Sequence, residues 1–162
     1  MRSYAVCKET DAASALSSEL VPDVTTLNCG QFLQKALLKT PSDGRLWLEI
    51  ARNLSQNNGE TSEIIRALKL SYQFAPREQW IAIIRTGFAI SIWAALPDDV
   101  QQLTRNELKE LLPNYSYRQG LAKIYTKKPF SRKTISLLML DQSNEVQKQF
   151  LGALRFELRS PN

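Results

Sequence analysis

Hydrophobic residues recur at helical spacing along most of the chain, in segments that end at proline or glycine. Between Asp43 and Gly59, for example, Leu46, Ile50 and Leu54 fall on one side of a helix. No segment keeps the strict alternation of apolar and polar residues that a half-buried β-strand requires. The pattern therefore predicts an all-α protein of about seven helices.

Polar residues at the ends of these segments predict where helices begin and end. Ser42 and Asp43 are both suited to cap the helix that follows them, and Gly59 is suited to end that helix in the left-handed backbone conformation. Thr104 and Glu107 have the Thr-x-x-Glu spacing of a capping box. This spacing leaves two alternatives for residues 98–112, one helix or two short ones.

Residues 80–96 differ from the other segments, because 13 of their 17 positions are apolar. A helix that is hydrophobic on every side belongs in the core of a protein. We therefore expect a central helix from about residue 77 to residue 96, ended by Pro97, with the other helices packed around it. The segment is shorter than the ~20 apolar residues that cross a bilayer, so no membrane span is predicted.

Arg85 is the one charged residue within residues 80–96. A buried guanidinium group requires a paired carboxylate, because leaving a buried charge unpaired costs about 3–5 kcal/mol. Glu78, Glu49 and Glu63 are the nearest candidates by sequence pattern. Arg85 then belongs to a structural ion pair, lies on a helix face that reaches solvent, or anchors an acidic ligand in a groove.

Two prolines mark an internal repeat, since Pro41 and Pro76 are 35 residues apart. Matching residues stand 12, 8, 5 and 4 positions before each proline: Cys29, Leu33, Ala36 and Leu37 in the first case, and Ile64, Leu68, Ser71 and Tyr72 in the second. The segment after Pro41 carries Trp47, Ile50, Ala51 and Leu54, which follow the W-x2-L-G-x2-Y pattern with Ala in place of Gly. Residues 44–77 thus resemble a tetratricopeptide repeat, and residues 28–41 resemble half of one.

This resemblance implies a short superhelix of helix pairs, closed around residues 80–96. Tetratricopeptide-like helices imply a protein-protein interaction or scaffold module that binds another protein or peptide. The residues expected to contact the partner are Arg52, Arg66, Tyr72 and Arg85. An incomplete repeat also leaves an apolar end through which a homodimer could form. More loosely, residues 31–112 resemble small bacterial helical proteins from polysaccharide-biosynthesis settings.

The composition argues against catalysis. The chain has no histidine, and its two cysteines, Cys7 and Cys29, have no metal-ligand spacing. Gly-rich phosphate loops and nucleophile elbows are also missing from the sequence. We therefore expect no enzyme activity, no cofactor and no metal.

Charge is unevenly distributed along the chain. Residues 114–162 carry nine Lys or Arg against three acids, whereas residues 1–113 carry twelve bases and thirteen acids. A basic region of this kind is suited to a phosphate backbone, a membrane surface or an acidic polysaccharide, or it is simply a solubilising face. The alternative function is therefore an anionic-polymer binder, with Tyr115, Tyr117 and Tyr125 interleaved among five bases. These bases are Lys123, Lys127, Lys128, Arg132 and Lys133.

The same pattern predicts a flexible lead-in at residues 1–26 and a single helical domain at residues 27–162. No secretory signal is visible in the first residues, which predicts a cytoplasmic protein. The location would be periplasmic or membrane-associated if an N-terminal anchor is missing from this chain.

Overall fold

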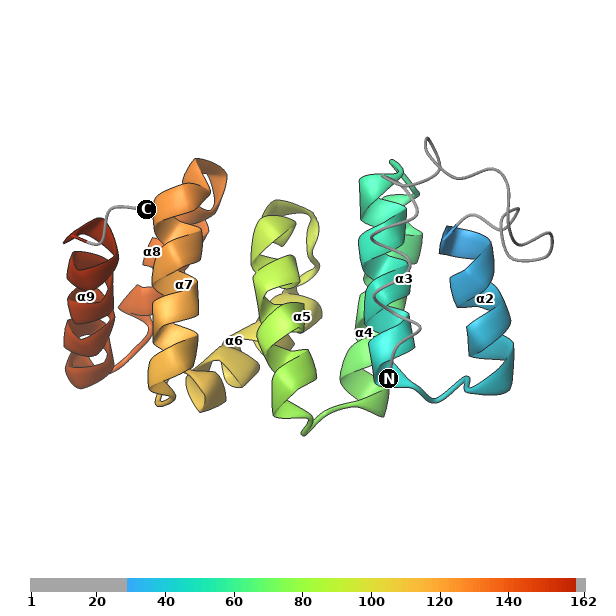
Figure 1. The fold of residues 1–162 in the computed structure, drawn as a ribbon, viewed down its shortest axis with the longest axis horizontal. Coiled ribbons are helices and arrows are strands. Elements are labelled where there is room, and N and C mark those ends of the chain that lie inside the picture. Colours follow the sequence, from blue (N-terminus) through green and yellow to red (C-terminus); the bar gives the residue numbers. More distant parts are fainter. Residues whose placement is uncertain (1–28, 160–162) are drawn as a thin grey trace, which may run out of the picture.

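The computed structural model describes residues 29–159, and within this range the chain is entirely helical (Figure 1). Eight α-helices and two 3-10 turns are present, and this part of the chain contains no strand. The prediction of an all-α fold is confirmed. The elements are α2 (Cys29–Lys39), α3 (Gly44–Gln56), α4 (Thr61–Phe74), α5 (Gln79–Ser91), η1 (Trp93–Ala95), α6 (Asp98–Leu111), α7 (Tyr115–Lys127), η2 (Pro129–Ser131), α8 (Arg132–Leu140) and α9 (Asn144–Arg159).

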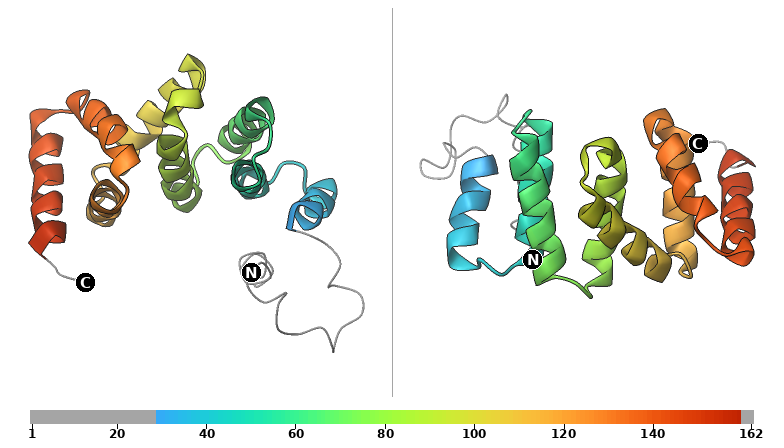
Figure 2. Two further views of the ribbon diagram at one scale, coloured as in Figure 1. Left: turned by 90° about the horizontal axis from the view of Figure 1, so that it is seen from above. Right: turned by 180° about the vertical axis from the view of Figure 1, so that it is seen from behind.

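The helices follow one another along the long axis of the molecule, from α2 at one end to α9 at the other (Figure 1). Helices α3, α5, α7 and α9 form the layer that faces the reader in Figure 1, and α4, α6 and α8 lie behind them, as the two views of Figure 2 show. The structure therefore consists of two layers, with consecutive helices from α3 onward alternating between them.

Two hydrophobic clusters hold these layers together. The first joins α3, α4 and the beginning of α6 and includes Leu48, Leu68 and Val100. The second joins α6, α7, α8 and α9 and includes Leu108, Leu121, Ile135 and Phe150. Helix α5 contributes buried residues to both clusters: Ile81 and Ala89 to the first, and Ala82 and Ile90 to the second.

The expectation that residues 80–96 form one helix buried on every side is wrong. Helix α5 ends at Ser91, and a 3-10 turn follows at Trp93–Ala95. The hydroxyl of Ser91 donates to the carbonyl oxygen of Phe88 at 2.6 Å. This side-chain hydrogen bond satisfies a backbone carbonyl near the end of the helix. Trp80, Ile83 and Ile84 are exposed, because the side of α5 that carries them faces away from both clusters.

Helix ends agree with the sequence pattern at Asp43 but differ from it at Gly59. The Asp43 carboxylate accepts hydrogen bonds from the backbone N–H groups of Arg45 and Leu46, at 2.9 and 3.2 Å. After α3 the left-handed residue is Asn58, with φ of 55°, and not Gly59. Asparagine tolerates this conformation better than most residues, so the turn is completed one position earlier than predicted.

The capping-box alternative at Thr104 is also wrong, since α6 is a single helix from Asp98 to Leu111. The Thr104 hydroxyl is buried and donates to the carbonyl oxygen of Val100 at 2.8 Å, one turn earlier in the same helix. Thr104 therefore lies within the helix and does not cap a new one.

The start of α3 packs tightly against the end of α4 through Gly44. A Cβ atom on Gly44 would lie 2.5 Å from the Cβ atom of Ala75, which is closer than such atoms can approach. Gly44 is therefore required by the close contact of these two helices.

The predicted lead-in at residues 1–26 lies outside the described residues. Within residues 29–159, none of the helices combines the length and the apolar character that crossing a membrane requires.

Candidate functional site

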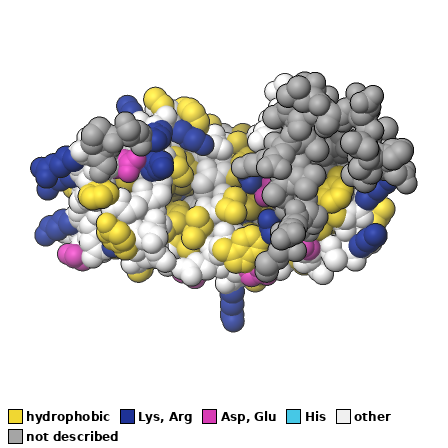
Figure 3. All heavy atoms as spheres, viewed as in Figure 1, with side chains coloured by type: hydrophobic (Ala, Val, Ile, Leu, Met, Phe, Trp, Pro, Cys, Tyr) yellow, Lys and Arg dark blue, Asp and Glu magenta, His cyan; other side chains and the backbone are white. Residues whose placement is uncertain are grey.

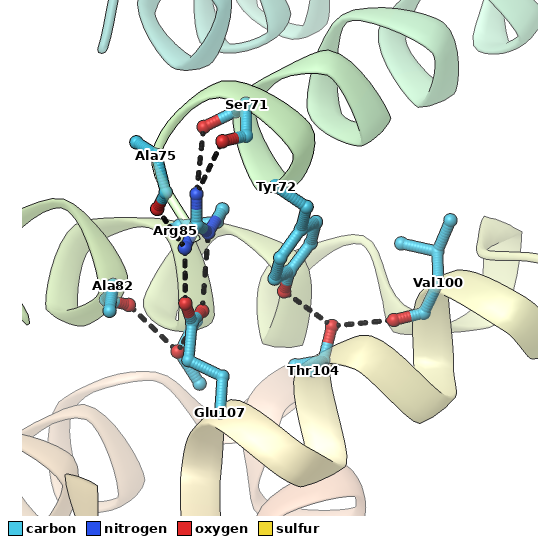
Figure 4. A network of polar contacts seen from close by, with 9 residues as sticks. Ser71, Tyr72, Ala75, Ala82, Arg85, Val100, Thr104 and Glu107 are labelled. Atoms are coloured by element: carbon cyan, nitrogen blue, oxygen red, sulfur yellow. Dashed lines mark hydrogen bonds and ion pairs between the residues drawn. The ribbon is translucent and has the colours of Figure 1, made fainter. Parts of the chain in front are cut away.

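Arg85 lies at the centre of a buried polar network that joins α4, α5 and α6 (Figure 4). Its side chain is fully buried, with 0% exposure, and all five of its N–H groups have acceptors. One terminal nitrogen donates to the backbone oxygen of Ser71 at 2.7 Å and to the hydroxyl of Ser71 at 3.2 Å. The other terminal nitrogen donates to the carbonyl oxygen of Ala75 at 3.1 Å and to Oε1 of Glu107, and Nε donates to Oε2 of Glu107 at 3.3 Å.

Glu107 supplies the charge that balances Arg85. Its carboxylate is almost completely buried and forms an ion pair with the guanidinium group. The Thr86 hydroxyl lies 3.0 Å from Oε2 of Glu107 and 2.7 Å from the carbonyl oxygen of Ala82, so its single proton is shared between two acceptors. The pair is thus hydrogen-bonded beyond its own two members, which is the arrangement that a buried ion pair requires.

Tyr72 extends the network toward the start of α6. The guanidinium carbon of Arg85 lies 4.2 Å from the centre of the Tyr72 ring, within the range of a cation-π interaction. The Tyr72 hydroxyl and the Thr104 hydroxyl are 2.8 Å apart. Because Thr104 uses its only proton on the carbonyl oxygen of Val100, Tyr72 must be the donor in this contact.

Burial also controls the ionisation of the two tyrosines in this region. Removal from water, with the Glu107 carboxylate nearby as the second cause, raises the pKa of the Tyr72 hydroxyl far above its ordinary value. Burial likewise raises the pKa of the Tyr117 hydroxyl. Both side chains are therefore neutral at physiological pH.

The carboxylate partner of Arg85 differs from the candidates that the sequence pattern suggested. Glu78 and Glu63 are exposed to solvent, and Glu49 pairs with Arg52 on the same helix at 3.0 Å. The actual partner, Glu107, comes from α6, 22 residues further along the chain. Helical periodicity shows which residues share one helix face, but it does not show which separate helices face each other.

The four residues predicted to contact a partner protein do not lie together on the surface. Tyr72 and Arg85 are buried in the network and contact each other, so they are not available to a partner in this structure. Arg52 is partly exposed and paired with Glu49, and Arg66 is exposed on α4. Arg52 and Arg66 therefore remain at the surface, and further exposed surfaces are formed by residues that the sequence pattern did not single out.

One such surface is the exposed side of α5, which we call the α5 ridge and define as Trp80, Ile83 and Ile84. These side chains are 47%, 41% and 38% exposed and stand at positions i, i+3 and i+4 of the helix. The guanidinium carbon of Arg45 lies 4.9 Å from the centre of the Trp80 ring. The sequence did not predict the ridge, because apolar residues at this spacing are equally typical of a helix side that packs against the core.

An open groove of about 710 Å³ lies between α2 and α3. Trp47 forms part of its wall, and its indole N–H donates to the carbonyl oxygen of Pro41 at 2.8 Å. The described residues that line the groove are Gln31, Gln34, Lys35, Leu37, Leu38, Pro41 and Trp47. Lys35 is the one ionisable side chain among these described residues, and no carboxylate stands beside it in the lining.

Lys and Arg side chains gather at the end of the molecule formed by α7, α8 and α9, as Figure 3 shows. Lys123, Lys127, Lys128 and Lys133 are all exposed there. Arg132 is committed to the end of α7, because its guanidinium group donates to the carbonyl oxygens of Tyr125 and Thr126, both at 2.9 Å. All five bases predicted to bind an anionic polymer are exposed, and Arg132 has two of its five N–H groups in bonds to its own chain.

The tyrosines interleaved with these bases do not form a stacking surface. Tyr117 is buried, and Tyr125 packs edge-on against Phe150, with ring centres 6.2 Å apart. Tyr115 is exposed. A nucleic acid that stacked its bases on all three rings would need them on one open face, which the structure does not provide.

The described part of the chain also holds no group of three or more His, Cys, Asp or Glu side chains placed to bind a metal ion. Comparison of the chain with protein-family models, curated proteins and solved structures finds no match. The assignment of a function therefore depends on the geometry of the network and of the exposed surfaces.

Proposed function

We propose that this protein is a non-catalytic protein-protein interaction or scaffold module, and that its α5 ridge binds an amphipathic helix of another protein. The observation that carries the proposal is the contrast between the two sides of α5. One side holds Arg85 with all five N–H groups filled, and the other exposes three large apolar side chains.

The buried side of α5 supports this function by fixing the helix in place. Arg85 connects α5 to α4 through Ser71 and Ala75, and to α6 through Glu107. A surface on a helix that is held from two directions loses little conformational freedom when a partner binds. The ridge is therefore a preorganised surface.

The exposed side supports the choice of partner. Apolar anchors at positions i, i+3 and i+4 on one helix match the spacing at which a second amphipathic helix presents its own apolar residues. Exposed tryptophan and isoleucine side chains gain free energy when another apolar face removes them from water. We propose a setting in polysaccharide biosynthesis on the resemblance of residues 31–112 alone.

The proposal is tested by capture with immobilised protein from an extract of the source cell. The ridge variant is the double substitution Trp80→Ala with Ile84→Lys, and the matched control is Leu103→Lys, since Leu103 is 40% exposed on α6. A protein that the wild type and the control retain and that the ridge variant loses supports the proposal. Retention by all three, or no specific capture by the wild type, overturns it.

Light scattering of the purified protein distinguishes a second copy of the chain from a different partner. If the wild type is a dimer and the ridge variant is a monomer, the ridge is a homodimer interface and the proposed heterologous partner is wrong.

A further inference from the structure

A second surface, separate from the α5 ridge, begins with an unusual distribution of charge in the sequence. Residues 115–140 contain six Lys or Arg and no Asp or Glu. The next acid, Asp141, pairs with Arg105 of α6. Surfaces that only keep a protein soluble usually mix both signs of charge, so this segment is suited to an anionic partner.

Within this segment, η2 and α8 together expose an apolar stripe. Ile135, Leu138 and Met139 are buried on one side of α8. Phe130, Leu137 and Leu140 are 67%, 49% and 72% exposed. The intervals of seven and three residues place these three side chains along one side of a helical segment. We call these three residues the α8 stripe.

Lysine residues border the α8 stripe. Lys127 and Lys128 come directly before η2, and Lys133 lies on α8, three residues after Phe130. Four ion pairs join described residues, namely Arg52 with Glu49, Lys69 with Asp99, Arg85 with Glu107, and Arg105 with Asp141. Within residues 29–159, therefore, no carboxylate neutralises the three lysines.

The α8 stripe and the α5 ridge share no residue, since the stripe belongs to η2 and α8. Helix α8 lies behind α7 in Figure 1, and Figure 2 shows it from behind.

We propose that the α8 stripe binds the surface of an anionic lipid bilayer, with Phe130, Leu137 and Leu140 in the interface and the lysines against the lipid headgroups. A helix with an apolar side and flanking lysines lies in the plane of such an interface, and its binding strength depends on both buried apolar area and charge. Lysine side chains keep their ammonium groups at headgroup level while their methylene groups lie along the apolar boundary. The segment attaches to the membrane without crossing it.

The structure favours a bilayer over a nucleic acid for this surface. Arg132 already donates from Nε and from one terminal nitrogen to carbonyl oxygens at the end of α7, which leaves fewer of its N–H groups for a phosphate. Leu137 and Leu140 would gain little from a phosphate backbone, whereas both gain from burial among acyl chains. A surface of aliphatic side chains and lysines therefore matches an anionic lipid bilayer better than it matches a nucleic acid.

The test is sedimentation of the full chain with lipid vesicles. One set of vesicles is phosphatidylcholine, and in the other set part of it is replaced by phosphatidylglycerol. The wild type is expected to sediment with the anionic vesicles, and less so as salt is added, because salt screens the lysines. Binding that is equal on both sets, or absent from the anionic set, overturns the proposal.

Two groups of substitutions separate the apolar contribution from the charge. The triple variant Lys127→Ala, Lys128→Ala and Lys133→Ala is expected to lower the partition coefficient between anionic vesicles and water about 100-fold. This follows from an attraction of about 1 kcal/mol between each lysine and the anionic surface. Phe130→Ser with Leu140→Ser is expected to lower it at least about 10-fold, since two large apolar side chains no longer insert. Circular dichroism of each variant checks that these exposed substitutions leave the helices folded.

Matched controls come from the opposite end of the molecule. Leu38 is 85% exposed on α2, and Lys35 and Lys39 are exposed beside it. Leu38→Ser with Lys35→Ala and Lys39→Ala is expected to leave vesicle binding unchanged. An equal loss in this control means that binding follows overall charge and apolar exposure, which overturns the assignment to α8.

A single-stranded oligonucleotide is the competing probe. If the protein binds it through Lys127, Lys128 and Lys133 and does not bind the anionic vesicles, the surface is a nucleic-acid site and the proposal is wrong. The lysine and α8 substitutions leave Trp80 and Ile84 in place, so a loss of vesicle binding in those variants is separate from the proposed α5 ridge.

Discussion

Two regions of this molecule carry positive charge, and they differ in burial and in whether a carboxylate pairs with the charge. At the centre, Arg85 is fully buried and its five N–H groups all have acceptors, two of them on Glu107. At the α7–α8 corner, Lys127, Lys128 and Lys133 are exposed beside apolar side chains, with no carboxylate among the described residues in an ion pair with them.

The difference separates structural charge from charge that is available for binding. A guanidinium group whose donors are all used has no N–H group left for a ligand, so the charge of Arg85 is satisfied within the fold. Lysines without partners beside exposed apolar groups add little to the stability of the monomer. Substitution at the centre should therefore change folding, and substitution at the corner should change binding.

The largest effect is expected at the centre. Arg85→Ala leaves the Glu107 carboxylate buried and unpaired, and should lower the free energy of unfolding by about 3–5 kcal/mol. Glu107→Ala should cost a similar amount, because it leaves the guanidinium group unpaired. Denaturation with urea measures both values.

Two further variants show whether the loss comes from an unpaired charge. The double variant Arg85→Met with Glu107→Leu removes both charges and should recover much of the lost stability. Arg66→Ala, a control at an exposed arginine on α4, should change the free energy of unfolding by less than about 0.5 kcal/mol. Full stability in the Arg85→Ala protein would contradict the structural role.

A smaller effect is expected at Tyr72. Tyr72→Phe removes the proton that is donated to Thr104 and should cost about 0.5–1.5 kcal/mol in urea denaturation at neutral pH.

The pH dependence at Tyr72 has a definite sign. Because burial raises the pKa of Tyr72 above its ordinary value of 10.0, folding favours the neutral hydroxyl. The stabilisation is complete below that ordinary pKa and is lost as the pH rises above it. Tyr72→Phe should therefore weaken the alkaline loss of stability, and the remainder should come from Tyr117, whose pKa is also raised. Identical alkaline profiles for variant and wild type would show that Tyr72 is not responsible.

At the corner, substitution should leave folding nearly unchanged. Phe130→Ser and Lys133→Ala should each alter the free energy of unfolding by no more than about 0.5 kcal/mol, since both side chains are exposed. Thermal unfolding followed by circular dichroism measures the change. A large destabilisation in either variant would mean that the corner is part of the folded core.

The smallest effect is expected at Lys69 and Asp99, a surface ion pair at 2.6 Å that joins α4 and α6, the helices that the buried network also joins. The hydrogen bond from Lys69 lowers the pKa of Asp99 below its ordinary value. The small contribution of this pair to stability is therefore present above the ordinary pKa and is lost as the pH falls through the lowered pKa. In Lys69→Ala, the Asp99 pKa measured by NMR titration should rise toward its ordinary value, with little change in stability.

The sequence was sufficient to predict the helical class, the Asp43 cap and the need for an acidic partner of a buried Arg85. These features depend on local spacing or on the chemistry of one residue. Glu107 could not be identified as the partner, because that contact depends on how α5 and α6 meet across 22 residues. For the same reason Tyr72 was expected on a surface, although it lies inside the network.

The exposed surfaces were the least accessible to sequence reasoning. The isoleucines of residues 80–96 look alike in the sequence, yet Ile81 and Ile90 are buried while Ile83 and Ile84 are exposed. Helical spacing separates the two groups, but it does not show which group faces the core. The apolar stripe of α8 was not predicted, because Leu137, Leu140 and the buried Ile135 are all apolar residues of one short helix and their spacing does not show which of them face the core.

The network around Arg85 also implies an order of assembly during synthesis. Three of its five hydrogen bonds lead back to Ser71 and Ala75, which leave the ribosome 14 and 10 residues before Arg85. The other two lead to Glu107, which emerges 22 residues later. Helix α5 can therefore reach its partners on α4 before α6 is synthesised. The guanidinium group becomes fully enclosed only with α6 in place, and α6 is the helix that brings the compensating charge of Glu107.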